Sequence, residues 1–212
     1  MSEIRPLRTL DVAILSDAPH SYIPHVTEPA TNALPPAMIR VATNADVLAM
    51  ANVHIVSWRE SYPGMLPDPM LARLSIADEA IRWQRILDRP VAQGGSVAFV
   101  ADQQGSIVGY GSCGEQRTGL LRDHGFTAEI GELYVLRSAQ RQGAGSGLMK
   151  AMAATLIDRG HRTMSLWVLE ENSPARRFYE CLGGMPIAEK REGLVEVAYG
   201  WTDLRLLSEP AD

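Results

Sequence analysis

The chain has little of what several common protein classes require. Its 212 residues include 2 cysteines and 5 histidines. Each of the two cysteines falls inside a predicted regular element, so we expect no disulfide. The histidines show no spacing typical of a metal site, so we expect no bound metal. No apolar run approaches the roughly 18 residues of a membrane span, and the first residues lack the apolar core of a signal peptide. No basic stretch indicates nucleic-acid binding. These absences favour a cytoplasmic protein that binds neither membrane nor nucleic acid.

The composition that remains is that of one well-packed domain. Hydrophobic residues make up 46% of the chain and charged residues 21%, and the net charge of −5 gives a weak, long-range preference for a cationic substrate. Six of the 13 prolines lie in residues 1–37, where hydrophobic periodicity is poor. We interpret residues 1–37 as a proline-rich extension, loosely attached or docked, and residues 38–212 as the domain. Met38 is an alternative natural start.

The most informative motif is the glycine-rich run from Gln140 to Gly147. It follows the apolar stretch Ile130–Leu136 and opens the helical pattern Leu148–Ile157. The first amides of a helix lack internal partners, the helix dipole is positive there, and glycine lets a backbone approach a phosphate. This order of elements predicts a site for a phosphate-bearing ligand, in which a side chain at Gly145 would fill the cradle. The alternative is a glycine-rich connection that binds nothing.

Three familiar glycine motifs do not fit this run. A P-loop requires Lys-Ser or Lys-Thr after its second glycine, and Gly147 is not followed by either. A dinucleotide fingerprint would place its third glycine at Leu148 or Lys150. A serine nucleophile elbow requires glycines two residues to either side, whereas Ser146 has Ala144 and Leu148 there.

The remaining Gln-x-x-Gly-x-Gly pattern, after the strand Leu133–Val135, resembles the pyrophosphate-binding motif of the GNAT superfamily of acetyl-CoA-dependent N-acetyltransferases. A second block, from Leu166 to Gly184, resembles the fifth strand, the asparagine and the Ala-x-x-Phe-Tyr helix of that superfamily. The segment Ser57–Tyr62 is also similar. The resemblance covers residues 38 to about 206. It departs at Gly184, where many members have Phe, and at Arg137, where many have Pro.

The pattern of elements predicts a mixed sheet with helices on both faces. The resemblance implies an α/β (α+β) fold: a mixed, mostly antiparallel sheet of about six or seven strands with flanking helices. In that fold two adjacent central strands splay apart to admit the pantetheine arm of the coenzyme. Periodicity and turn residues predict strands over 38–42, 97–101, 107–113, 128–135, 164–169, 186–190 and 194–199. They predict helices that begin after Asn44 or Asp46, at Ser75, at Leu148 and after a Ser173 cap.

The first predicted helix has an apolar face made by Leu48, Ala51, Ile55 and Trp58. The helix that follows the glycine run has a buried side made by Leu148, Met149, Met152, Ala153 and Leu156. The strands 128–135 and 164–169 are expected to be parallel, joined by a right-handed crossover.

Acetyl transfer to an amine requires a base, a donor for the oxyanion and an acid for the thiolate. The two-residue period of a strand puts Glu129 on one face with Gly131, Leu133 and Val135. In the resembling family a glutamate four residues before the Leu of Leu-x-Val commonly acts as the base, which implies this role for Glu129. A solvated or arginine-paired Glu129 is the alternative. Glu132, on the opposite face, is the weaker candidate.

The resemblance implies that Tyr179 is the acid, that Asn172 contacts the pantetheine or fixes the splay, and that the Val135 N–H binds the thioester carbonyl. A buried core tyrosine and ordinary turn chemistry are the alternatives for the first two. The predicted coenzyme-binding set is Leu133, Tyr134, Val135, Gln140, Arg141, Gln142, Gly143, Ala144, Gly145, Ser146, Gly147, Asn172 and Tyr179. Within this set Arg141 either pairs with a phosphate or is solvated, and Ser146 is a helix-start residue.

The resemblance also implies that Trp58, Glu60 and Tyr62 line the acceptor pocket, where aromatic faces and a carboxylate suit a cationic amine. The alternative is a core tryptophan with Glu60 on the surface.

The function predicted is an N-acetyltransferase that moves acetyl from acetyl-CoA to a primary amine of a small molecule, by direct attack in a ternary complex. The alternatives are a protein N-terminal or lysine acetyltransferase and a non-catalytic acetyl-CoA sensor. A homodimer is common in the superfamily.

Overall fold

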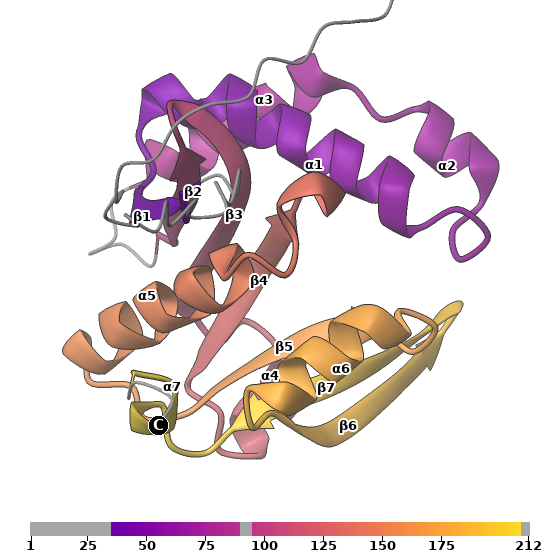
Figure 1. Ribbon diagram of the computed structural model, residues 1–212. Coiled ribbons are helices and arrows are strands. Elements are labelled where there is room, and N and C mark those ends of the chain that lie inside the picture. Colours follow the sequence, from indigo (N-terminus) through magenta and orange to yellow (C-terminus); the bar gives the residue numbers. More distant parts are fainter. Residues whose placement is uncertain (1–34, 90–94, 209–212) are drawn as a thin grey trace, which may run out of the picture. The chain divides into compact units, whose positions relative to one another are not determined.

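The fold is described here from a computed structural model, for residues 35–89 and 95–208. The predicted extension 1–37 lies almost entirely outside these described residues. Seven strands form one sheet in the order β1-β2-β3-β4-β5-β7-β6 (Figure 1). All neighbours in it are antiparallel except β4 and β5. The strands are β1 Met38–Val41, β2 Val97–Gln103, β3 Ser106–Glu115, β4 Ala128–Val135, β5 Met164–Leu169, β6 Met185–Glu192 and β7 Leu194–Trp201.

Helices lie on both faces of this sheet, so the predicted fold class is confirmed. Among the described residues, no helix is long and apolar enough to cross a membrane. The α-helices are α1 Val47–Ser61, α2 Asp68–Ala72, α3 Ile76–Leu87, α4 Gly119–Asp123, α5 Ala144–Asp158, α6 Ser173–Cys181 and α7 Arg205–Ser208, and short 3-10 turns are η1 Asn44–Asp46 and η3 Arg137–Ala139.

Tight turns join the two outer hairpins, as the sequence predicts. Between β2 and β3, Gln104 and Gly105 both have positive φ angles of 55° and 84°, which is the geometry of a type I′ turn. Between β6 and β7, Gly193 has a φ of 84°. These turns set the register of the two hairpins.

The α5 helix covers one face of the sheet and α1 with α3 covers the other. The predicted buried side of α5 is confirmed, because its five apolar residues all have no exposed surface. The predicted face of α1 is wrong at Leu48, which is 65% exposed, while Met50, Val53 and His54 are buried. The buried side is displaced because α1 packs on α3 as well as on the sheet.

The central strands β4 and β5 separate soon after they meet. Their parallel pairing includes only Ala128 with Met164 and Glu129 with Ser165, and Figure 1 shows the two strands running apart beyond that point. Six residues of β4, 130–135, therefore have a neighbour on the β3 side only. This divergence is the splay that the resemblance implies.

A β-bulge at Gly131 reverses part of the predicted face assignment. Ser112 pairs with Glu132 but Cys113 pairs with Ile130, so Gly131 is the extra residue. The prediction that Glu129 shares a face with Leu133 and Val135 is wrong, because the bulge shifts the alternation by one. Glu129 lies with Glu132 on the α1 side of the sheet, whereas Leu133 and Val135 pack toward α5. The prediction that the two glutamates lie on opposite faces fails for the same reason.

The start of α1 is held by a buried carboxylate. Asp46 occupies the N-cap position, but its side chain accepts hydrogen bonds from the backbone N–H and the hydroxyl of Thr43, at 2.8 and 3.0 Å. Both of its oxygens also accept from the guanidinium of Arg40, each at 2.8 Å. These contacts, led by the Arg40 hydrogen bonds, lower the pKa of Asp46 from 3.8 to about 2.

We expect Asp46 to make stability depend on pH in the acid range. Its pKa is lower in the folded chain, so its ionised form stabilises the fold above about pH 4, and this contribution is lost as the pH falls toward 2. Urea unfolding of the wild type and of Asp46→Asn between pH 5 and pH 2 measures this. The difference between the two proteins should shrink as the pH falls. A constant difference would contradict the assignment.

Candidate active site

The N-terminus of α5 presents free backbone amides. Gly143 is its N-cap, with a φ of 87°, and the first hydrogen bond of the helix runs from the Gly147 N–H to the Gly143 carbonyl at 2.9 Å. The N–H groups of Ala144, Gly145 and Ser146 therefore point out of the helix end, where the helix dipole is positive. The preceding Arg141 also has a positive φ, of 59°. The turn so formed aims amides at one point, as an anion site requires.

Two of the glycines are also closely packed. A Cβ on Gly145 would lie 3.2 Å from the Phe178 ring on α6, and a Cβ on Gly147 would lie 2.9 Å from Ile39 on β1. The expectation that a side chain at Gly145 would fill the cradle stays a prediction. A positive φ makes glycine the favoured residue at Gly143.

The two glutamines of the motif hold the loop itself. Gln140 donates from its side-chain amide to the Val135 carbonyl at 3.1 Å, and Gln142 donates to the Ser138 carbonyl at 2.8 Å. The Gln142 side-chain oxygen accepts from Gln103 of β2 at 3.3 Å. Arg141, in contrast, is exposed, so its guanidinium is available to a phosphate.

The unpartnered edge of β4 faces the splay. The Leu136 N–H donates to the Val108 carbonyl at 2.9 Å, and hydrogen-bonded pairs alternate in an antiparallel ladder. The N–H and C=O groups of Leu133 and Val135 therefore point away from β3, into the gap. Gln140 takes the Val135 carbonyl. The Val135 N–H therefore faces the gap, and its role as the oxyanion donor stays a prediction.

Tyrosine side chains from three elements meet beside the gap. Tyr62, just after α1, interacts through its hydroxyl with Tyr134 of β4 and with Asn172, and burial raises its pKa. Tyr179 of α6 is 7% exposed and packs among Phe178, Tyr199 and Trp201. Burial, and next the proximity of Tyr62, raises the pKa of Tyr179 well above its ordinary value. The Tyr179 hydroxyl therefore keeps its proton at neutral pH.

Asn172 is the N-cap of α6. Its side-chain oxygen accepts from the Ala175 N–H at 3.3 Å, so the prediction of Ser173 as the cap is one residue too late. The same side chain also interacts with the Tyr62 hydroxyl, which links the start of α6 to the residue that follows α1.

Trp58 and Glu60 have different surroundings although both lie near the end of α1. Trp58 stacks on His54 with ring centres 5.0 Å apart, and it meets Tyr62 edge-on at 5.2 Å. Glu60 accepts from the backbone N–H of Arg137 at 3.0 Å, and the Arg137 guanidinium donates to the Glu60 carbonyl at 2.5 Å. Trp58 and Tyr62 thus form one aromatic wall, while Glu60 is tied to η3, the turn that precedes the glycine-rich run.

The two departures from the family pattern have local causes. A proline at position 137 would have no N–H to give, whereas Arg137 donates one to Glu60. At Gly184 a Cβ would lie 2.6 Å from the Trp201 ring, so Trp201 fills the space that a larger side chain would need.

Glu129 is an ion-paired carboxylate. One of its oxygens pairs with the Arg117 side chain, and the other accepts from the Arg117 backbone N–H at 3.0 Å. The residue is 9% exposed. The arginine-paired alternative therefore describes the arrangement, and the role of Glu129 as the base stays a prediction.

A buried polar cluster next to the aromatic wall was missed by sequence reasoning. His54 of α1 lies 2.8 Å from the Tyr110 hydroxyl, 3.2 Å from Glu79 and 3.5 Å from Glu132. Arg82 contacts Glu79 at 2.5 Å and Glu132 at 2.6 Å. One signal was available: His54 precedes Trp58 by four residues, so the two share a helix face.

This cluster contains a donor set of the kind that binds metals. Ligand atoms of His54, Glu79 and Glu132 lie within 4.8 Å of one another. However, the guanidinium of Arg82 already bridges the two carboxylates. Since a bound cation would have to displace or crowd this charge, we assign no metal to the cluster.

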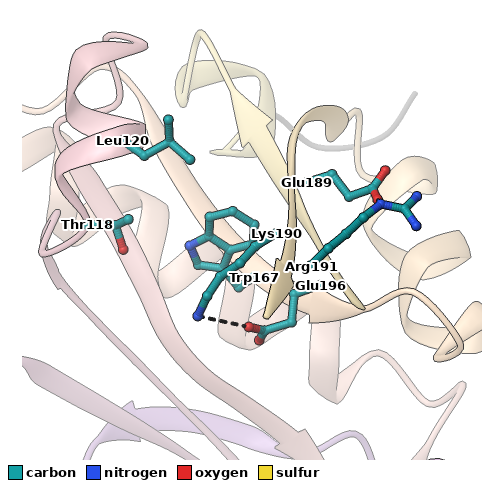
Figure 2. Close-up of a pocket in the computed structure, with 7 residues that line it drawn as sticks. All are labelled: Thr118, Leu120, Trp167, Glu189, Lys190, Arg191 and Glu196. Carbon is teal, nitrogen blue, oxygen red and sulfur yellow. Dashed lines mark ion pairs between the residues drawn. The ribbon is translucent and has the colours of Figure 1, made fainter. Parts of the chain in front are cut away.

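A hollow of about 530 Å³ opens beside the last hairpin (Figure 2). Trp167 and Glu196 border it, and Lys190 pairs with Glu196 at 3.6 Å. Cross-strand pairing puts these three side chains on the sheet face opposite to α6, the face that also carries Glu129. After burial, the largest cause, the charge of Glu196 is one of the smaller influences that raise the pKa of Tyr62. Its lining is Thr118, Leu120, Trp167, Glu189, Lys190, Arg191 and Glu196.

Comparison with known proteins decides the family. The profile of the Acetyltransferase (GNAT) family matches residues 52–183. YuaI, an uncharacterised N-acetyltransferase of Bacillus subtilis, is 33% identical over 175 residues, which cover 80% of this chain and 95% of YuaI. The chain belongs to the GNAT family of acetyltransferases.

Solved GNAT structures share its fold at low sequence identity. A GCN5-related N-acetyltransferase from Rhodopseudomonas palustris superposes with a TM-score of 0.62 at 17% identity, over 80% of this chain and 98% of its own. The PaiA N-acetyltransferase of Thermoplasma acidophilum, in complex with coenzyme A, gives 0.59 at 17% identity, over 77% and 98%. Family membership makes this GNAT protein an acetyl-CoA-dependent acyltransferase.

The packing assignment of Gly145 can be tested by coupling. Gly145→Ala sets the gain of placing alanine in a helix against the contact of the new methyl group with the Phe178 ring, so the free energy of unfolding should rise by less than the roughly 1 kcal/mol usual for this change in a helix. In a Phe178→Leu background Gly145→Ala should raise the free energy of unfolding clearly more than it does in the wild type, because the ring that the methyl group contacts is gone. Urea unfolding measures both, and calorimetry should find acetyl-CoA affinity nearly unchanged in Gly145→Ala. Additive stability changes together with lost acetyl-CoA binding would instead favour the cradle.

Proposed function

We propose that the protein transfers the acetyl group of acetyl-CoA to a primary amine of a small molecule, by direct attack within a ternary complex. The observation that carries this proposal is the splay of β4 and β5. The gap lies between a helix end rich in free amides and an aromatic wall on the opposite face of the sheet. Two ligands can therefore approach the same strand edge from two sides.

The coenzyme side of the gap fits a pyrophosphate and a pantetheine arm. The free amides of α5 and the exposed Arg141 would hold the phosphates. The backbone groups of Leu133 and Val135 that face the gap would hold the amides of the arm, with Tyr134, Asn172 and Tyr179 along its path. Acetyl-CoA, when bound, supplies the thioester. The Val135 N–H would then donate to the oxyanion that develops on its carbonyl.

The acceptor side fits a compact cationic molecule. Trp58 and Tyr62 offer aromatic faces, which attract an ammonium group. The hollow of about 530 Å³ is of the size that holds small ligands, and Trp167 and Glu196 would contact the body of the acceptor. The homodimer and the cytoplasmic location expected from the sequence stay predictions.

Tyr179 is proposed as the acid that protonates the departing thiolate. Its burial raises its pKa, so the hydroxyl carries a proton to give at neutral pH. Tyr179→Phe should lower turnover by about 10- to 1000-fold, because it removes this proton while keeping the ring among its neighbours. Release of coenzyme A thiol measures turnover, and calorimetry should show acetyl-CoA affinity preserved. Unchanged turnover would remove Tyr179 from the mechanism.

Glu129 as the base is tested against its structural alternative. If Glu129 accepts a proton, Glu129→Gln should lower kcat, and a higher pH should restore part of it because more of the amine is already deprotonated. Arg117→Met is the matched control, since it removes the ion pair and leaves the carboxylate. Should both variants show the same loss with a wild-type pH profile, Glu129 serves structure rather than proton transfer.

The proposal as a whole is tested by thiol release from acetyl-CoA across a panel of small amines, amino acids and peptides. Turnover on small amines supports it. Turnover on peptides alone would replace it with a protein N-terminal or lysine acetyltransferase. Acetyl-CoA binding without turnover would favour a sensor, and the absence of binding would overturn the assigned site.

A further inference from the structure

The buried cluster beside the aromatic wall brings polar and charged groups from three elements to one imidazole on a fourth. Around Nδ1 of His54, in α1, lie the Tyr110 hydroxyl of β3 at 2.8 Å, Glu79 of α3 at 3.2 Å and Glu132 of β4 at 3.5 Å. The His54 residue itself is 7% exposed. A histidine buried with three polar partners is held in one orientation.

The hydrogen-bond directions in this cluster define the tautomer of His54. The Tyr110 hydroxyl donates to Glu132 at 2.5 Å, so it accepts from the ring. Carboxylates only accept. Nδ1 must therefore carry the hydrogen, and in the neutral ring Nε2 is the atom with the free lone pair. Within the described parts of the chain, Nε2 makes no hydrogen bond.

The partners of His54 keep their own protonation states at neutral pH. Burial raises the pKa of Tyr110 well above its ordinary value, so Tyr110 stays a donor. Burial also acts to raise the pKa of Glu132, but hydrogen bonds from His54 and Tyr110 and the charge of Arg82 lower it below its usual value. Glu132 is thus a carboxylate.

The carboxylates beside Nδ1 of His54 are placed to stabilise a positive charge that develops on the imidazole. Glu79, Glu132 and Arg82 sum to one negative charge, and Arg82 touches both carboxylates. A protonated imidazole would bring the sum to zero. The cluster can therefore take up one proton without leaving an unbalanced buried charge.

The cluster also borders the place proposed for the acceptor. The His54 ring stacks on Trp58 and meets Tyr134 edge-on, each with ring centres 5.0 Å apart. The charge of Glu132 influences both Tyr62 and Tyr134. The imidazole thus lies in contact with Trp58, one of the residues that would hold the amine.

We propose that His54 accepts, at Nε2, the proton that the acceptor ammonium releases before attack. This inference rests on the proposed function. The N–H bond of the ammonium breaks, its electron pair stays on nitrogen as the attacking lone pair, and the proton forms a new bond to Nε2. The imidazolium is stabilised by Glu79 and Glu132, and it returns the proton to water after the product leaves. His54 is then a catalytic residue, and Glu79, Glu132 and Tyr110 are positioning residues.

His54→Asn tests this inference with little disturbance. The asparagine amide takes the place of the Nδ1 donor, but nothing replaces the lone pair of Nε2. At pH 7, kcat/KM for an aliphatic amine found in the panel should fall by about 100-fold or more. The rising limb of the pH profile should move to higher pH, since the variant uses only amine that is already deprotonated. His161→Asn, the same change at an exposed site, should leave both unchanged.

An analogue of the same amine with fluorine on its β-carbon distinguishes a loss of proton transfer from a structural defect. Its amine is less basic and more of it is neutral at pH 7, so His54→Asn should lose much less activity on it. Glu132→Gln should change kcat/KM and the rising limb of the pH profile in the same direction as His54→Asn, by a smaller factor. The titratable and charged groups that face His54, and that contribute to the pH dependence of kcat/KM, are Glu79, Arg82, Tyr110, Glu132 and Tyr134.

The outcomes distinguish this inference from the function on which it rests. A wild type that acetylates amines, with a His54→Asn variant that keeps the wild-type pH profile, would overturn the role of His54 and leave the acetyltransferase standing. Equal losses on the two amines would also overturn it, because they indicate a merely structural defect. A wild type that binds acetyl-CoA but acetylates no amine would overturn both.

Discussion

The early end of the pairing between β4 and β5 is the constraint on which the rest of the structure depends. Two residue pairs join the strands and then the sheet opens. Buried backbone N–H and C=O groups need partners, and an unpaired edge inside a sheet is costly. The fold meets part of this need internally, where Gln140 takes the Val135 carbonyl. The rest is met if a ligand rich in amide groups enters the gap, which is the chemistry of pantetheine.

Once the sheet is open, each half needs its own support. On the β4 half, α5 buries a fully apolar side against β1 to β4, and the bulge at Gly131 turns Leu133 and Val135 toward it. On the β5 half, α6 is capped by Asn172 and packs through Tyr179. The bulge has a second effect, because it turns Glu129 and Glu132 together to the α1 side of the sheet. Burying two carboxylates there is unfavourable without compensation, and Arg117 and Arg82 supply it.

The sequence was sufficient for the elements that obey regular periods or local motifs. The buried side of α5 was predicted because the helical spacing determines it. The helix after the glycine run was predicted too, but it begins at Ala144 rather than at the predicted Leu148, because the glycines are part of its first turn. The face of Glu129 was not, because a two-residue period has no place for an extra residue, and a single glycine in a strand is a weak signal of a bulge. His54 was missed since its partners come from α3, β3 and β4, which only the tertiary fold brings together. Likewise, no local sequence pattern shows that Gly145 faces the ring of Phe178, which lies on another helix.

The hydrogen bond from the Arg137 N–H to Glu60 has a consequence for the thermodynamics of the two ligands. It connects the last turn of α1, beside the acceptor wall, to the loop that leads into the phosphate cradle. A movement of either segment must carry the other or break this bond. A ligand that orders one segment therefore lowers the entropy that the second ligand still has to remove. By linkage the effect is reciprocal: if bound coenzyme raises the affinity for the acceptor by some factor, bound acceptor raises the affinity for the coenzyme by the same factor.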